Sequence, residues 1–391
     1  APTPLRVRPR NFILALARLG HAITLATVVE GKAEAEALRV FESHGVTVLA
    51  LPLGLARKGI NVLGALFSPE PLQARFSWQP RLAAGLADAA ANADVIHIEH
   101  LRGARYGLGL KQTLVERCPP IVWDSVDCIT HLFEQAKTHR RGLAGRALTA
   151  FELPRTRRYE ARLTGAFARV LVTSPRDRDA LAALAQASIS VVTNGVDLVS
   201  FATPPPGARR AASVLFSGKM SYHANVAAAV FLAEEVMPLV WARRPEARLL
   251  IAGSRPPARV RALAAHDRRV TVTGYVTDMA GLMRSAAVGV APMLYGAGVQ
   301  NKVLEAMACG LPVVATPLAI AALERVGPGE ECLVGATPAE LAAAIVALLD
   351  DPGRAADLGR AGRRYAEAHH NWAAIARQLT GIYEEVARGK P

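Results

Sequence analysis

The sequence is poor in cysteine and has no long apolar segment. Its four cysteines are widely spaced and include no CxxC pair, a pattern that indicates neither a disulfide framework nor a zinc site and favours a reducing compartment. No uninterrupted apolar run reaches the roughly 18 residues that a membrane-spanning helix needs. The first residues, APTPLRVRPR, lack the apolar region of a signal peptide. We therefore expect a cytoplasmic protein without a spanning segment.

Aromatic residues are also scarce. They make up 5% of the 391 residues, whereas hydrophobic residues as a whole make up 51% and are dominated by alanine, leucine and valine. A chain this hydrophobic buries a core and is not disordered. Aliphatic residues in short continuous runs are typical of parallel strands covered by helices, and the length favours two domains.

Acidic residues are outnumbered, with 33 Asp and Glu against 46 Lys and Arg, for a formal net charge of +13. Such an excess predicts an anionic membrane surface or a nucleic acid as partner, or reflects only an arginine-rich composition. No zinc-finger, homeodomain or RNA-binding signature is present, so we expect no nucleic-acid partner. The segment Lys137–Arg178 is especially basic, and a basic helix there would either dock on anionic lipids or present a solvated face.

Short aliphatic runs alternate with helical stretches along the whole chain, which predicts an α/β fold with parallel sheets. In the first half we predict strands at Ala22–Val28, Val46–Leu51, Val95–Ile98, Ile121–Trp123, Val170–Thr173 and Ile189–Val192. In the second half we predict strands at Val214–Ser217, Arg248–Ala252, Val270–Thr273, Val288–Ala291, Pro312–Ala315 and Cys332–Val334.

A proline-rich break separates the two halves. Residues 201–212 read FATPPPGARRAA, and three successive prolines continue neither a helix nor a central strand. We predict one Rossmann-like domain at 1–200, a linker at 201–212 and a second Rossmann-like domain at 213–370. A final helix at 371–391 either caps the second domain or crosses back to the first. Two facing domains of this kind leave a deep cleft, beside the carboxyl ends of the strands.

The segment Tyr295–Pro317 is the strongest candidate for a binding site. A glycine-containing loop precedes a predicted helix that Asn301 would cap, and unpaired N–H groups with the helix dipole favour an anion there. Lys302 lies in the first helical turn, where the helix dipole disfavours a cation unless an anion lies beside it. Glu305, one turn further, is placed to accept two hydrogen bonds from a ribose diol. The alternative is an ordinary solvated Lys and Glu on a surface helix.

This segment resembles the donor-binding motif of the retaining glycosyltransferases of family 4, which have the GT-B fold. The matching residues are Gly298, Glu305, Ala306, Ala308, Gly310, Pro312, Val313 and Val314. The resemblance implies that Glu305 grips the nucleotide ribose. It also shows a departure, because Ala297 stands where the family has a first Glu that contacts the donor sugar.

The resemblance extends over most of the chain. In LFSGKMSYHAN, Gly218 and Lys219 fall where the family binds the diphosphate, whereas Ala224 replaces a usual second Lys, so we infer that Lys302 supplies the missing charge. The resemblance points to a subgroup associated with exopolysaccharide and surface polymers. The donor-binding residues it implies are Gly218, Tyr275, Val276, Gly298, Val299, Gln300, Asn301 and Glu305.

The first domain is expected to hold the acceptor. Asp124 and Asp127 follow one predicted strand, and His100 follows another together with His97, Glu99 and Arg102. These side chains are candidates for contacting the acceptor, or else are caps and surface charges. The family's first loop resembles PLRVRPRN, whose Arg6 and Arg8 would face a phosphate or an anionic acceptor. The strand that precedes this loop in the family is absent from the sequence.

The resemblance implies transfer of a sugar from a UDP- or GDP-sugar to a hydroxyl of a glycan or lipid-linked acceptor, with retention of configuration. Lys219 and Lys302 would stabilise the leaving diphosphate, so we expect no metal and no further cofactor. Asp124, Asp127 and His100 complete the predicted catalytic set. The localisation that follows is cytoplasmic, peripheral at the inner face of the membrane. Two alternatives remain, a nucleotide-sugar 2-epimerase and a nucleotide-sugar-binding protein with impaired catalysis.

Overall fold

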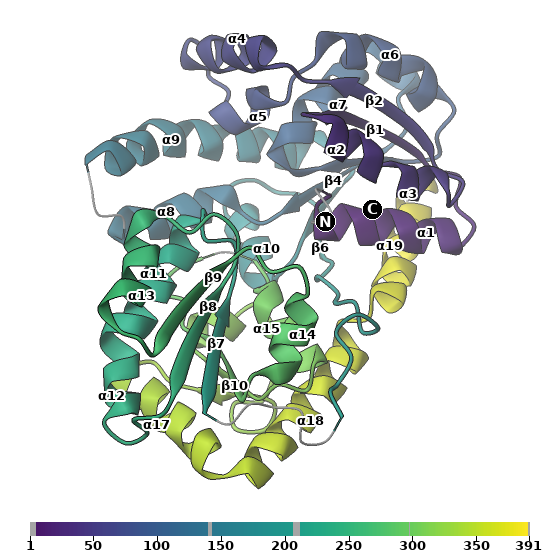
Figure 1. The fold of residues 1–391 in the computed structure, drawn as a ribbon. Helices are drawn as coiled ribbons and strands as arrows, with labels where there is room; N and C mark the ends of the chain where they lie inside the picture. Colours follow the sequence, from purple (N-terminus) through teal and green to yellow (C-terminus); the bar gives the residue numbers. More distant parts are fainter. Residues whose placement is uncertain (1–4, 140–142, 206–211, 297, 390–391) are drawn as a thin grey trace. The chain divides into compact units, whose positions relative to one another are not determined.

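The computed structural model describes residues 5–139, 143–205, 212–296 and 298–389 (Figure 1). The chain divides into two compact units. Unit 1 comprises residues 1–193 together with 372–391, and unit 2 comprises 194–371. Residues 201–205 and 212 of the predicted linker belong to unit 2, and its residues 206–211 lie outside the described part of the chain.

Unit 1 alternates helices with parallel strands. Its strands are β1 (Thr24–Val29), β2 (Thr47–Pro52), β3 (Ile96–Glu99), β4 (Ile121–Val126), β5 (Arg169–Val172) and β6 (Ile189–Val191). Its helices are α1 (Val7–Arg18), α2 (Lys32–Ala37), α3 (Arg39–Glu42), α4 (Leu55–Leu66), α5 (Leu72–Phe76), α6 (Pro80–Ala91), α7 (His100–Leu114), η1 (Val115–Arg117), α8 (Ile129–His139), α9 (Leu143–Ala166), α10 (Pro175–Ala182) and α19 (Trp372–Ala387).

The strands of unit 1 form two sheets within the described residues, β1-β2 and β3-β4-β5-β6, both parallel. β4 and β5 are buried along almost their whole length because helices cover both of their faces. The segment predicted to be a basic loop is instead the start of helix α1, with Arg6 as its N-cap residue and Arg8 inside the first turn.

The last helix, α19, packs in unit 1. Its apolar residues recur every three or four positions, so that Trp372, Ile375 and Leu379 form one buried stripe. This stripe contacts Phe12 of α1 and Val122 of β4 in a single hydrophobic cluster. The contact joins the end of the chain to its beginning and covers one face of the β3–β6 sheet.

Unit 2 contains one sheet of six parallel strands. They are β7 (Ser213–Ser217), β8 (Arg248–Ala252), β9 (Val270–Gly274), β10 (Val288–Ala291), β11 (Val313–Ala315) and β12 (Leu333–Val334). Its helices are α11 (His223–Phe231), η2 (Leu232–Val236), α12 (Met237–Trp241), α13 (Ala258–His266), α14 (Met279–Ser285), α15 (Asn301–Ala308), α16 (Pro317–Ile320), α17 (Pro338–Asp350) and α18 (Pro352–His369).

The strand order of this sheet is β12-β11-β10-β7-β8-β9. The chain runs outward from β7 to β9, returns to β10 beside β7, and then runs outward in the other direction. Figure 1 shows the consequence, with α11, α12 and α13 on one side of the strands and α14 and α15 on the other. β7 and β10 therefore mark a topological switch point, where the loops that follow neighbouring strands turn to opposite faces.

All twelve predicted strands are present, each within three residues of its predicted bounds. β4 extends three residues further than predicted, so Asp124 lies inside the strand and not after it. Among the described residues one helical stretch, His223–Trp241, is long and apolar enough to cross a membrane by length and composition. Two thirds of its most apolar window is buried inside the structure.

Candidate functional site

The switch point of unit 2 brings two predicted segments together. The loop after β7 carries Gly218 and Lys219 and leads into α11, whereas the loop after β10 carries Gly296 and Gly298 and leads into α15. Because β7 and β10 are hydrogen-bonded neighbours, these two loops lie beside each other at the carboxyl edge of the sheet. The ring of His223, from the first loop-helix, stacks on that of Tyr295, from the second, with centroids 5.4 Å apart.

Lys302 is held by side chains from three elements. Its Nζ donates to Oδ1 of Asn225 at 3.1 Å and to Oε1 of Gln300 at 2.9 Å, and it lies 5.7 Å from the ring centroid of Phe216 on β7. None of these partners is anionic. The ammonium is thus fixed in position at the switch point by neutral dipoles, without a carboxylate that would neutralise its charge.

The ionisation of Lys302 and of Glu305 reflects this burial. Desolvation lowers the pKa of Lys302 to about 8, against the smaller opposing effect of Glu305. Desolvation also raises the pKa of Glu305 to about 7, against the opposing charge of Lys302. Within the described residues the Glu305 carboxylate has no hydrogen-bond partner. Perturbed groups of opposite type one helical turn apart, beside a glycine loop, indicate a functional site.

Glycines at successive strand ends let the backbones pass close to one another. A Cβ atom on Gly253, after β8, would lie 1.7 Å from the carbonyl oxygen of Gly218, and Gly253 has φ of +153°. A Cβ on Gly218 would lie 2.8 Å from Nδ2 of Asn225. Gly253 therefore requires glycine, because a Cβ would collide with the backbone of the loop that carries Lys219, whereas a side chain at position 218 would displace the amide of Asn225.

The remaining residues of the predicted donor site lie around this loop pair. Lys219 is exposed, and within the described residues its side chain has no hydrogen bond or ion pair, so its ammonium is available to an anion. Tyr275 and Val276 follow β9 directly and are exposed and half-buried, respectively. Gly298 has φ of +65°, and Val299 is buried beneath the loop. Ala297, the position of the departure from the family motif, lies outside the described residues.

One local prediction for this segment was wrong. Gln300, not Asn301, is the N-cap residue of α15, and no side chain caps this helix end. Asn301 is the first helical residue, and its Oδ1 accepts a hydrogen bond from Asn194 Nδ2 at 3.1 Å. The helix N-terminus therefore lacks a side-chain cap, and this leaves room for a ligand to take that role.

Asn225 was missed as a site residue, although it ends the G-K-M-x-x-x-x-N pattern of the sequence. It is buried in α11, donates from Nδ2 to the carbonyl oxygen of Lys219 at 3.1 Å, and accepts from Lys302. One amide thus orients both lysine-bearing segments. The sequence did carry a signal for Asn225, because it is a polar residue in an otherwise apolar helix that follows a glycine loop.

In unit 1, the carboxyl ends of β3 and β4 gather the predicted acceptor-side residues. Arg8 donates from Nε to Oδ2 of Asp124 at 2.7 Å and from Nη2 to Oδ1 at 3.2 Å, and both side chains are buried. Arg8 also donates to the carbonyl oxygen of Thr193. His97 Nε2 lies 3.7 Å from Asp124, and its Nδ1 shares a hydrogen bond with the hydroxyl of Tyr383. Asp124 and Arg8 thus form an internal ion pair.

Glu99 ends β3 and His100 begins α7, and their side chains make fewer hydrogen bonds than that of Asp124. Burial raises the pKa of Glu99 to about 7, and Arg6, 3.8 Å away, opposes this effect. Burial lowers the pKa of His100 to about 3, so its ring is neutral near pH 7. Its Nδ1 is buried without a hydrogen-bond partner, and its φ is +61°. A non-glycine residue in the left-handed region with an unsatisfied ring nitrogen is typical of a functional position.

Asp127 lies at the start of the loop between β4 and α8. Burial, and then the nearby charge of Asp177, raise its pKa to about 7. Its Oδ1 accepts a hydrogen bond from Thr173 Oγ1 at 3.2 Å. The carboxyl of Asp127 is therefore harder to ionise than that of an exposed aspartate, and near neutral pH it is able either to donate or to accept a hydrogen bond.

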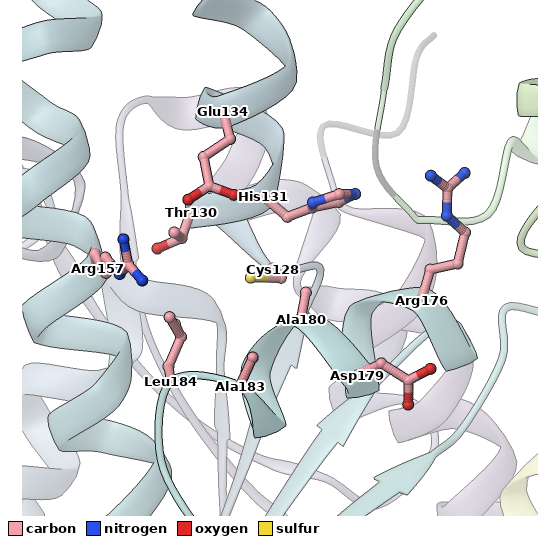
Figure 2. Close-up of a pocket in the computed structure, with 10 residues that line it drawn as sticks. All are labelled: Cys128, Thr130, His131, Glu134, Arg157, Arg176, Asp179, Ala180, Ala183 and Leu184. Atoms are coloured by element: carbon pink, nitrogen blue, oxygen red, sulfur yellow. The ribbon is translucent and has the colours of Figure 1, made fainter.

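A pocket of about 380 Å³ opens beside this loop (Figure 2). It lies between the start of α8, the middle of α9 and the start of α10, and Figure 2 shows Arg157 on one side and Arg176 on the other. Its lining residues are Cys128, Thr130, His131, Glu134, Arg157, Arg176, Asp179, Ala180, Ala183 and Leu184. Within the described residues no group of three His, Cys, Asp or Glu side chains has the arrangement of a metal site.

Two family profiles match the chain in succession. The family described as "Glycosyltransferase Family 4" matches residues 7–200, and the one described as "Glycosyl transferases group 1" matches residues 211–351. The first match covers the β3 and β4 ends of unit 1, and the second covers the loops and helix that carry Lys219 and Lys302.

Among curated proteins, similar sequences include mannosyltransferases and a glycogen synthase. The chain is 35% identical over 165 residues to the GDP-mannose-dependent monoacylated alpha-(1-6)-phosphatidylinositol monomannoside mannosyltransferase of Corynebacterium glutamicum, covering 39% of this chain and 43% of that protein. It is 33% identical over 244 residues to the phosphatidyl-myo-inositol mannosyltransferase of Mycolicibacterium smegmatis, covering 59% and 60%. The chain thus spans about half the length of the curated relatives it matches.

Solved structures share the fold over almost the whole chain. Sucrose-phosphate synthase from Thermosynechococcus elongatus superposes with a TM-score of 0.73 at 20% identity, over 98% of this chain and 94% of that one. Anabaena HepE in complex with UDP and glucose gives 0.69 at 16% identity, over 96% and 95%. These likenesses confirm the predicted α/β architecture with parallel sheets in two domains.

Proposed function

We propose, because the chain belongs to the family 4 glycosyltransferases and has their GT-B fold, that it moves a hexose from a nucleoside-diphosphate sugar to a hydroxyl of a lipid-linked acceptor. The observation that carries the proposal is the position of Lys302. Its ammonium is fixed at the switch point of a parallel sheet, beside the uncapped N-terminus of α15 and one turn from Glu305.

In unit 2 this arrangement suits a sugar nucleotide. The diphosphate would lie against the first turn of α15, between Lys302 and the free ammonium of Lys219, with the glycine-lined backbone of Gly218 beside it. Glu305 would accept two hydrogen bonds from the ribose diol. Tyr275 and Val276, after β9, would border the base.

The chemical step needs charge stabilisation at the leaving group. As the bond from the anomeric carbon to the diphosphate oxygen breaks, negative charge grows on that oxygen, and Lys302 and Lys219 oppose it. The acceptor oxygen would bond to the same face of the carbon and release its proton to the departing phosphate oxygen. We propose that these two cations take the role of a metal ion in this step.

The nucleotide and the acceptor are proposed from the relatives. The C. glutamicum relative is named as GDP-mannose-dependent, so we propose GDP-mannose as the first donor to examine, ahead of UDP-sugars. The mannosyltransferase relatives are named for phosphatidylinositol-based acceptors, and these names support a glycolipid acceptor over an exopolysaccharide. A lipid-linked acceptor would place the protein at the inner face of a membrane.

On the acceptor side we propose that Glu99, His100 and Asp127 contact the acceptor. Their raised or lowered pKa values leave each of them able to hydrogen-bond a hydroxyl near pH 7. Asp124 would act through its neighbours, because Arg8 occupies both of its oxygens. Arg6, half-exposed next to Glu99, is the cation available to an acceptor phosphate.

Replacing Glu305 by alanine is expected to weaken donor binding at least about 100-fold. Two hydrogen bonds to a carboxylate are lost, and each hydrogen bond to a charged group contributes about 1.5–3 kcal/mol. Isothermal titration with GDP-mannose and with GDP measures the effect. Glu234→Ala, at an exposed glutamate of the same unit, is the matched control. Equal dissociation constants for Glu305→Ala and the wild type would refute the ribose assignment.

Donor affinity is expected to be greatest between about pH 7 and pH 8. Below pH 7 Glu305 becomes protonated and accepts fewer hydrogen bonds, and above pH 8 Lys302 loses the charge that pairs with the diphosphate. The dissociation constant of GDP should be measured from pH 6 to 9.5 for the wild type and Lys302→Met. The alkaline loss of affinity should disappear in the variant; an identical alkaline limb in both proteins contradicts the assignment.

Donor binding without transfer would favour the alternative of an impaired binding protein. The discriminating measurement is release of GDP from GDP-mannose in the presence of phosphatidylinositol and of simple polyol acceptors. Interconversion of the free sugar nucleotide to its 2-epimer, without transfer, would instead favour the epimerase.

A further inference from the structure

Helix α4 of unit 1 exposes an apolar face that nothing in the described structure covers. Leu55 is 84% exposed, Leu63 61% and Phe67, directly after the helix, 91%, and Ile60 and Leu66 are exposed beside them. These five side chains form what we call the α4 face. The opposite side of the helix is buried through Asn61 and Ala65. Figure 1 shows α4 at the outer edge of the unit, with α5 and α9 inward of it.

This face is too apolar for a solvent-exposed helix of an isolated molecule. Single exposed leucines are common, but a contiguous set on one helix marks an interaction surface. The helix has no acidic residue, and its two charges are Arg57 and Lys58. Lys58 pairs with Glu30 at 2.6 Å, so the cations of this surface beyond Arg57 must come from elsewhere. A helix with an apolar face and an aromatic end beside cationic side chains is the form that lies in the interfacial region of a lipid bilayer.

Helix α9 continues the same surface. Arg155 donates from Nη1 and Nη2 to the carbonyl oxygens of Ala65 and Leu66, each at 3.0 Å, which ties α9 to the end of α4. The guanidinium of Arg155 lies 3.8 Å from the ring centroid of Phe151, and Phe151 is itself exposed, as is Leu148. The apolar surface therefore extends from α4 onto the first half of α9.

The charges that α9 presents to solvent are all positive. Its two acidic residues, Glu152 and Glu160, are buried and accept hydrogen bonds from backbone N–H groups of neighbouring segments. The exposed charged residues of this helix are Arg146, Arg157, Arg158 and Arg162. Burial of the acids thus converts a helix of mixed composition into a cationic one at the surface.

We propose that the α4 face inserts into the headgroup region of an anionic bilayer while Arg158 and Arg162, which share the side of α9 that carries Phe151, contact its phosphates. A second copy of the chain is a poorer occupant, because two molecules each carrying +13 would bring the same arginines together. An anionic lipid surface satisfies both the apolar and the cationic component. The inference deepens the proposed function by naming the surface through which the enzyme reaches a lipid-linked acceptor.

The expected result is binding to vesicles of phosphatidylcholine with phosphatidylglycerol in the absence of donor and acceptor. The variant Leu63→Gln/Phe67→Gln should lower the vesicle partition coefficient at least about tenfold per residue, since burying one such side chain is worth more than one tenfold step. Arg158→Gln/Arg162→Gln should weaken binding to anionic vesicles and reduce its salt dependence. Co-sedimentation measures both, and circular dichroism checks the fold.

The matched apolar control is Val199→Gln, at a residue 87% exposed in unit 2, and it should bind like the wild type. Two results would overturn the proposal: no binding of the wild type to anionic vesicles, or equal loss of binding in Val199→Gln and Leu63→Gln/Phe67→Gln. A concentration-dependent dimer that the α4 variant abolishes would assign the face to a second copy instead. Vesicle binding requires no turnover. A failure to bind vesicles would therefore contradict the membrane proposal without contradicting the proposed transfer of the sugar.

Discussion

Replacing Lys302 by alanine is expected to lower kcat about 100- to 1,000-fold, the loss found when one preorganised donor to a developing anion is removed. The ammonium is held by Asn225 and Gln300 before any donor binds, so its orientation needs no reorganisation during the reaction. Its charge matters most when the leaving oxygen becomes anionic. The loss should therefore fall mainly on kcat, with a smaller change in the dissociation constant of the donor.

Two further variants separate charge from packing. Lys302→Met retains much of the side-chain volume and should lose as much activity as Lys302→Ala, whereas Lys219→Ala, at an exposed position, should lose less. Steady-state kinetics with GDP-mannose, in the presence and absence of a chelator, provides the measurement. If Lys302→Met retains kcat within threefold of the wild type, Lys302 does not stabilise the leaving group.

Replacing Arg8 by alanine is expected to lower the free energy of unfolding by about 3–5 kcal/mol. Arg8 is the only cation that donates to the fully buried carboxylate of Asp124 in the described residues, and removing one partner of a buried pair leaves the other charge uncompensated. The same change frees the first turn of α1 from β4 and from the carbonyl of Thr193. Urea denaturation followed by circular dichroism measures the loss.

Arg6→Ala is the matched control, because Arg6 is half-exposed and its pair with Glu99 spans 3.8 Å. A long pair with one half-exposed partner is expected to contribute less than the buried pair, about 0–1 kcal/mol. The double variant Arg8→Met/Asp124→Leu should recover part of the stability by removing both charges. Equal effects of Arg8→Ala and Arg6→Ala would show that the buried pair contributes little.

Much of the architecture can be predicted from the local pattern of apolar residues. Aliphatic runs such as Val288–Ala291 and Arg248–Ala252 are strands at the predicted bounds because buried parallel strands have a continuous apolar sequence. The C-terminal helix is equally evident, since Trp372, Ile375 and Leu379 recur at helical spacing. Its assignment to unit 1 does not follow from that spacing, because an apolar stripe does not specify the surface it covers.

The site was predictable in part for the same reason. A glycine loop before a helix, with Lys302 and Glu305 in its first turns, indicates an anion site whatever surrounds it. The role of Arg8 was not predictable, because its partner Asp124 is 116 residues away and only burial converts the two into an ion pair. The apolar face of α4 was overlooked because exposure is decided by what does or does not pack against a helix.

The amino-acid sequence by itself thus determined the parallel α/β fold, the two halves and the loop-helix that carries Lys302, because each depends on residues adjacent or one turn apart. Only the tertiary structure decided that Asn225 joins this lysine to the backbone of Lys219, since β10 pairs with β7 and not with β9, which precedes it in the chain. It also decided that the acids of α9 are buried and its arginines exposed. Which distant groups meet, and which remain in solvent, depends on strand order and packing, and these are properties of the whole chain.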